Sequence, residues 1–136
     1  MRTKRILVAA LATLVLGGCS LFTEPEDSWS RLAGNWVSSN PISNSAQTYR
    51  KTDYLRLTIS QLGTGSWSFG GYSSPLTAGT FANNSVSFTL VGSGPGGYSA
   101  LLTATYKDDR IEGVLSGATS QFDPFNSVPV VLVRGN

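Results

Sequence analysis

The most nucleophilic side chain in this chain belongs to Cys19, the only cysteine among 136 residues. Cys19 follows Gly17 and Gly18 at the end of an apolar run over residues 6–16. Its thiolate is the form that attacks electrophiles, so a cysteine in this setting can accept a covalent group. The chain has no histidine. It therefore offers neither a Ser-His-Asp triad nor the usual zinc ligands, and one cysteine cannot form an internal disulfide.

The residues before Cys19 have the organisation of an export signal. Met1 to Arg5 is basic, and the apolar run is far shorter than the ~20 residues that span a bilayer as a helix. Leu16-Gly17-Gly18-Cys19 resembles the bacterial lipobox, in which an aliphatic residue and two small residues precede a cysteine. The resemblance implies that diacylglycerol is attached to the Cys19 thiol and that the lipoprotein signal peptidase cleaves before this residue.

This resemblance predicts a signal peptide over residues 1–18 and a lipidated N-terminus with a polar tether over residues 19–30. Two or three acyl chains anchor a protein durably, whereas one chain anchors it only marginally. Ser20 after the cysteine resembles lipoproteins that are sorted to the outer membrane. The expected location is extracytoplasmic, on a bacterial membrane. An unlipidated signal peptide, or a transmembrane anchor in which Cys19 is incidental, is the alternative.

The net charge argues against a nucleic-acid partner. The full chain has a formal net charge of +2 from ten basic and eight acidic residues. Arg2, Lys4 and Arg5 precede Cys19, which leaves seven basic residues against eight acidic ones and a net charge of −1. Binding to phosphates needs a clustered basic face, and downstream of Cys19 only Arg50 and Lys51 are adjacent.

Period-2 alternation of apolar and polar residues predicts strands in the rest of the chain. In the segment YLRLTIS, Leu55, Leu57 and Ile59 alternate with polar residues. Turn signals such as Gly70-Gly71, Asn83-Asn84 and Asp108-Asp109 separate such segments. We expect about eight strands, over residues 32–38, 54–61, 66–70, 77–82, 85–91, 98–107, 111–117 and 128–134.

The fold class expected from this pattern is all-β. Downstream of the signal, no segment has the apolar spacing of a crossover helix, so a parallel sheet is not expected. Sequential antiparallel strands with one apolar face form either a small up-and-down β-barrel, which we favour, or a two-sheet β-sandwich. The barrel domain should cover residues 31–136.

Two short motifs at the ends of this domain resemble the lipocalins and their calycin relatives. Gly34-Asn35-Trp36 resembles the G-x-W that opens these barrels, and Arg134 near the end of the chain resembles their closing arginine. The resemblance implies that Trp36 fills the closed end of the barrel while Arg134 stacks on its ring. The chain departs from the lipocalin pattern in two ways. Its domain is small, and no helix is expected before the last strand.

A second group of residues could form a ligand-binding site. An apolar cavity would be lined by a set of large inward-facing side chains, namely Leu55, Leu57, Trp67, Phe69, Phe88 and Leu102. Ordinary core packing explains the same residues. The carboxylates Asp108, Asp109 and Glu112 are the local acidic cluster of the expected barrel domain, but a catalytic dyad needs desolvation that an exposed hairpin tip does not give.

We therefore expect a lipid-anchored envelope protein without catalytic residues, cofactor or metal. One hypothesis is that the barrel binds a small apolar or amphipathic molecule. The alternative is a fully packed, non-catalytic barrel that serves as a structural module or binds another envelope protein. In both cases the acylated Cys19 would contact membrane lipid.

The lipobox resemblance is tested by Cys19→Ala. The substitution removes the thiol that would accept the lipid, so uncleaved precursor should accumulate while the barrel still folds. Mass spectrometry of the protein extracted from membranes measures both lipidation and cleavage. Normal processing and acylation of the Cys19→Ala protein would rule out the lipobox.

Overall fold

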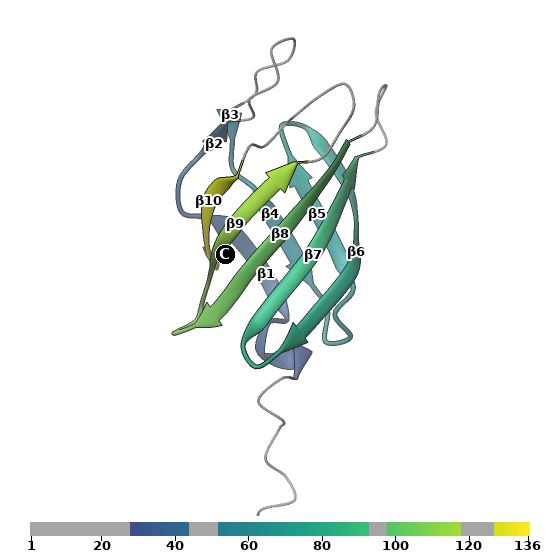
Figure 1. Cartoon of the computed structure of the whole chain (residues 1–136), viewed down its shortest axis with the longest axis vertical. Helices are drawn as coiled ribbons and strands as arrows, with labels where there is room; N and C mark the ends of the chain where they lie inside the picture. The colour runs from purple at the N-terminus through teal and green to yellow at the C-terminus, as the bar shows by residue number, and fades with distance from the viewer. Residues whose placement is uncertain (1–27, 44–51, 93–97, 118–126) are drawn as a thin grey trace, which may run out of the picture.

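Eight strands form one closed antiparallel barrel in this computed structural model (Figure 1). The structure describes residues 28–43, 52–92, 98–117 and 127–136. The barrel strands are β1 (Gly34–Ser38), β4 (Arg56–Ile59), β5 (Gly65–Phe69), β6 (Tyr72–Ala82), β7 (Ser85–Gly92), β8 (Tyr98–Lys107), β9 (Arg110–Gly117) and β10 (Val128–Arg134).

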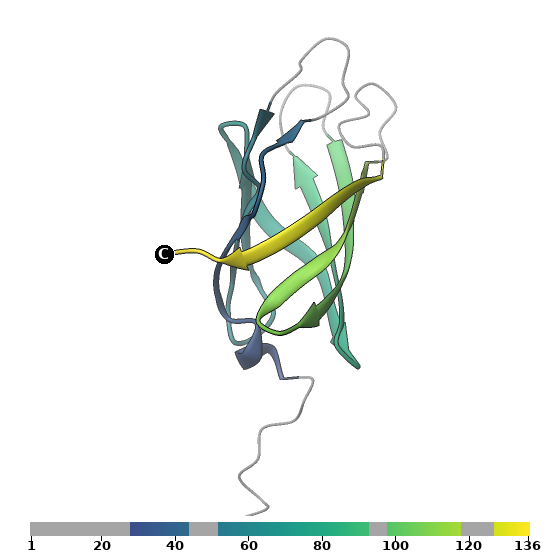
Figure 2. The same ribbon diagram turned by 90° about the vertical axis from the view of Figure 1, so that its left-hand side faces the viewer.

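The strands follow one another around the barrel in sequence order, and the first strand pairs with the last. β1 pairs with β4 on one side and with β10 on the other, where Trp36 lies opposite Arg134. Figure 2 shows β10 crossing beside β1 at this seam. The expected up-and-down barrel is thus confirmed, and the sandwich alternative is wrong because the sheet closes on itself.

Alternation along β4 decides which side chains enter the barrel. Leu55, Leu57 and Ile59 are buried, whereas Arg56 and Thr58 are exposed. Since successive side chains of a strand point to opposite faces of the sheet, the apolar set of this segment lines the interior. This confirms the prediction made from the YLRLTIS segment.

Three two-residue turns connect neighbouring strands where the sequence carries Gly70-Gly71, Asn83-Asn84 and Asp108-Asp109. All six of these residues have positive φ, between 50° and 87°. Positive φ at both central residues defines the type I′ turn, whose twist matches that of the flanking strands. Glycine, asparagine and aspartate tolerate this conformation better than other residues do, so these turn signals correctly located the hairpins.

Several boundaries differ from the sequence-based expectation. β6 begins at Tyr72 rather than Thr77, although Pro75 lies within it and cannot donate to a ladder. The strand accommodates Pro75 because the β5–β6 ladder ends at the Ser66–Pro75 pair. A small sheet of β2 (Ile42–Ser43) and β3 (Thr52–Asp53) was not expected.

The segment before β1 also differs from the expected tether. It contains a short 3₁₀ helix, η2 (Trp29–Arg31), capped by the Ser28 side chain. Trp29 packs against Phe81 and Phe88, with ring centroids 5.6 and 5.5 Å away. Residues 1–27 lie outside the described residues. Within the described part of the chain, no helix has the length and apolar character needed to cross a membrane.

Close packing of β8 against β9 depends on a glycine. A Cβ atom at Gly113 would lie 2.1 Å from the Thr103 carbonyl oxygen and 2.5 Å from Ala104 Cα. Gly113→Ala should therefore force the strands apart and lower the free energy of unfolding by about 1–3 kcal/mol, as overpacking commonly does. Urea unfolding followed by tryptophan fluorescence measures this loss.

Gly135→Ala is the matched control, since its Cβ would have no neighbour closer than 3.6 Å. It should leave the unfolding midpoint unchanged. Equal midpoints for Gly113→Ala and the unmodified chain would show that this close approach does not constrain the barrel.

Candidate binding site

One end of the barrel is closed by Trp36, which is 1% exposed. Its indole Nε1–H donates to the Leu32 carbonyl oxygen at 2.7 Å, so the only polar atom of the ring is satisfied where η2 ends. The ring of Tyr106 meets Trp36 edge-on, with centroids 6.2 Å apart. The indole therefore acts as part of the core and as a hydrogen-bonded link between η2 and the sheet.

Arg134 covers the outer side of this ring. Its guanidinium carbon lies 4.1 Å from the Trp36 ring centroid, within range of a cation–π interaction. Nη1 and Nη2 donate to the carbonyl oxygens of Ala33 and Arg31, each at 2.6 Å. A planar guanidinium can stack and donate in two directions at once, which a lysine cannot do.

Gly34 makes room for this guanidinium. A Cβ there would lie 3.0 Å from Arg134 Nη1, and the residue has a φ of +127° that side chains with a Cβ rarely adopt. Gly34 and Trp36 thus meet Arg134, which stands about 100 residues later in the sequence, at the closed end of the barrel.

Two further residues at this end were not identified from the sequence as site residues. Asp109 accepts from Arg134 Nε at 3.0 Å, and Arg31 lies with its guanidinium carbon 5.1 Å from the Tyr106 ring centroid. The Asp109 contact depends on the meeting of the β8–β9 turn with β10, and the Arg31 contact depends on the meeting of η2 with β8. The alternation of single strands carries no signal for such a contact, although Arg31 stands only three residues before Gly34.

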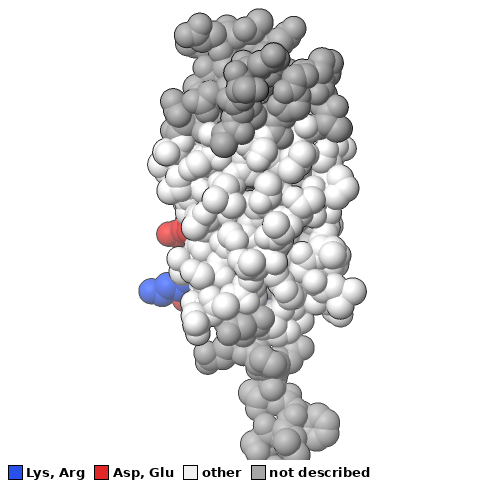
Figure 3. Space-filling model, turned by 45° about the vertical axis from the view of Figure 1, so that its right-hand side comes forward, with Lys and Arg blue, Asp and Glu red and all other residues white. Residues whose placement is uncertain are grey.

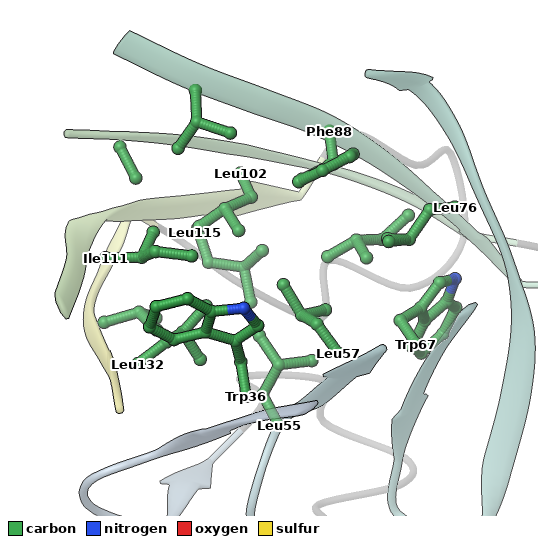
Figure 4. Packing of buried hydrophobic residues seen from close by; sticks show 14 of the residues in the cluster. Trp36, Leu55, Leu57, Trp67, Leu76, Phe88, Leu102, Ile111, Leu115 and Leu132 are labelled. Carbon is green, nitrogen blue, oxygen red and sulfur yellow. The ribbon is translucent and has the colours of Figure 1, made fainter. Parts of the chain in front are cut away.

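The six residues predicted to line a cavity all face the barrel interior. Trp67 is 2% and Phe69 4% exposed, and the other four are at most 1% exposed. Figure 4 shows that Leu57 and Trp67 project from one wall toward Phe88 and Leu102 on the opposite wall. Trp29 from η2 adds a ring beside Phe88.

The interior offers apolar surface rather than reactive groups. Ser38 is the single buried polar residue in the described part of the chain, and its hydroxyl oxygen accepts from the Leu55 backbone N–H at 3.0 Å. Within the described ranges, no group of three or more acidic or cysteine side chains is placed to hold a metal ion. The chemistry available inside the barrel is therefore burial of hydrocarbon.

The acidic cluster at the β8–β9 hairpin has structural partners. Asp108 and Asp109 have the positive φ of the turn, and Asp109 pairs with Arg134. Glu112 forms an ion pair with Arg110 at 3.5 Å. These contacts account for the carboxylates through turn formation and pairing. Cys19, the predicted lipidation site, lies outside the described residues.

Comparison of the chain with protein-family models, with curated proteins and with solved structures gave no match.

The Arg134 contact is tested by Arg134→Lys. Lysine keeps the charge but loses the stacked plane and one of the two directed donors, so the free energy of unfolding should fall by about 1–2 kcal/mol. Arg110→Lys is the control because the ion pair of Arg110 with Glu112 is exposed. Exposed pairs contribute little, so its urea midpoint should stay unchanged. Equal losses from the two variants would contradict a special role for Arg134.

Proposed function

We propose that this protein is a lipid-anchored lipoprotein of the bacterial cell envelope whose barrel binds a small apolar or amphipathic molecule. The observation that carries the binding part is the interior lining. Six large apolar side chains, all at most 4% exposed, converge from opposite walls of one closed barrel. Burying hydrocarbon against such a lining contributes about 25 cal/mol per Å², and no buried charge opposes it among the described residues.

The proposed entry is the end of the barrel opposite Trp36. The Trp36 end is covered by Arg134, by η2 and by the Tyr106 ring. At the other end, Ser38, Phe69 and Leu90 lie near the strand ends, and an amphipathic molecule would place its polar group there. The lipocalin-like motifs Gly34, Trp36 and Arg134 support this arrangement by resemblance.

The proposed location at the cell envelope rests on the sequence. The residues from Leu16 to Cys19 match the lipobox, and a basic, then apolar, segment precedes them. An acylated Cys19 would hold the barrel on the extracytoplasmic side of a membrane, with the outer membrane favoured by Ser20. The function needs neither a cofactor nor catalysis, since its chemistry is burial alone.

Ligand binding is tested by native mass spectrometry. A form covering residues 20–136, exported behind a signal without a lipobox, should carry a reproducible extra mass that is lost on denaturation. Leu102→Ala changes the interior and should alter the amount of bound mass. Leu101→Ala is the matched control from the adjacent position of β8, where the side chain is 48% exposed, and it should bind as the unmodified form does.

A bare mass that persists after incubation with fatty acids and envelope lipid extracts would contradict the binding proposal. That result would favour the second candidate function, a fully packed barrel that binds another envelope protein.

The outer wall of the barrel supports this second candidate. Val91, Leu101 and Val114 on neighbouring strands β7, β8 and β9 are 40–48% exposed. Figure 3 shows a broad face on which the described residues carry charge only at one margin. Neutral surface with exposed apolar residues is a common property of protein interfaces.

A further inference from the structure

The β4–β5 turn presents the most exposed large hydrophobic side chain in the described part of the chain. Leu62 is 83% exposed, whereas the others in this class range from 39% to 48%. Its neighbours Gln61, Gly63 and Thr64 carry no charge. A single exposed leucine is ordinary on a protein surface. The structure of the turn that carries Leu62 therefore decides whether this side chain is placed to make a contact.

Hydrogen bonds hold the turn in one shape. The Ser60 backbone N–H donates to the Thr64 carbonyl at 2.7 Å, and Gly63 N–H donates back to the Ser60 carbonyl at 3.1 Å. The Ser60 hydroxyl oxygen also accepts from the backbone N–H groups of Leu62 and Thr64, each at 3.2 Å. Leu62 therefore projects from a preformed turn, and little conformational entropy is lost when it makes a contact.

The turn is packed directly against the segment through which the chain enters the barrel. A Cβ at Gly63 would lie 2.4 Å from the Trp29 ring, and the positive φ of +76° there also requires glycine. Trp29 is in turn fixed by Phe81 and Phe88. Figure 1 shows η2 and the β4–β5 turn at the same end of the barrel, so Leu62 lies beside the start of the described chain.

We propose that Leu62 inserts into the lipid surface to which Cys19 anchors the protein, so that the barrel stands with its Trp36 end toward the membrane. This inference rests on the proposed lipidation. Residues 20–27 separate Cys19 from Ser28, and an extended chain of that length spans at most about 30 Å. The Leu62 turn is therefore held within reach of the bilayer.

Because the lipid anchor already holds the barrel close to the membrane, insertion of one leucine side chain is sufficient to orient it. A short tether raises the effective concentration of the second contact to roughly the millimolar range. Immersing one leucine side chain then favours the docked orientation by about tenfold. Two other described turns lie at this end. Asn83-Asn84 is polar, and Lys107–Arg110 has two positive and two negative residues, so both remain at the level of the headgroups. The barrel thus tilts toward Leu62, and the opposite end faces away from the membrane.

The test uses the full, processed protein in phospholipid vesicles, with a fluorophore attached through Leu62→Cys. The lipid occupies the Cys19 thiol, so the introduced thiol is the only one that reacts. Brominated phospholipids quench a probe that enters the hydrocarbon. The label at position 62 should lose emission and shift to shorter wavelength. Ser73→Cys is the control, because Ser73 is exposed beside the Gly70-Gly71 turn at the far end, and its label should show neither effect.

Flotation of the vesicles separates the two proposals. If the labelled protein floats and only the label at position 62 is quenched, the docking of Leu62 is supported. If the protein floats but the two labels respond alike, the docking proposal is overturned while the lipid anchor stands. If the protein does not float, the anchor fails and the docking proposal falls with it. Both substitutions are at exposed positions, and circular dichroism checks that each variant is folded.

Discussion

The contact between Arg134 and Trp36 is the interaction on which the closed barrel depends. Only three residue pairs join β1 to β10, and the two strands lie about 100 residues apart in the sequence. The pairing of the intervening strands with one another does not by itself bring β1 and β10 together, so closure has to be stabilised at this seam. Arg134 adds a stacked guanidinium on Trp36 and donors to the Ala33 and Arg31 carbonyls. One side chain thereby joins the last strand, the first strand and η2.

Much of the barrel could be predicted because its determinants are local. Alternation in segments such as residues 54–60 specifies which face is buried, and turn residues such as Asn83-Asn84 and Asp108-Asp109 specify where the chain reverses. When consecutive hairpins share one apolar face, an up-and-down sheet is the simplest solution. Closure does not follow from this pattern, because the same strands could form a two-sheet sandwich. The pairing of β1 with β10 makes the barrel closed.

The features that could not be predicted depend on contacts between distant segments. Trp29 belongs to the core because Gly63 leaves space for its ring and because Phe81 and Phe88 lie beside it. Nothing within residues 21–30 signals that packing. Strands β2 and β3 are each two residues long, and Ile42 pairs with Asp53. Strands of this length are too short to show a periodic pattern. Asp109 becomes a partner of Arg134 only when the β8–β9 turn meets the closing strand.

The distribution of polar groups limits what kind of selectivity the proposed site can have. Among the described residues, every charged side chain is outside the buried core, and Ser38 is bonded to the backbone of Leu55. A ligand inside this barrel would be distinguished mainly by length and shape, because none of the buried side chains among the described residues carries a charge. Binding inside would then be insensitive to salt and to pH. The charged contacts at the Trp36 end respond to salt, so ionic strength would affect the closure of the barrel rather than the affinity of its interior.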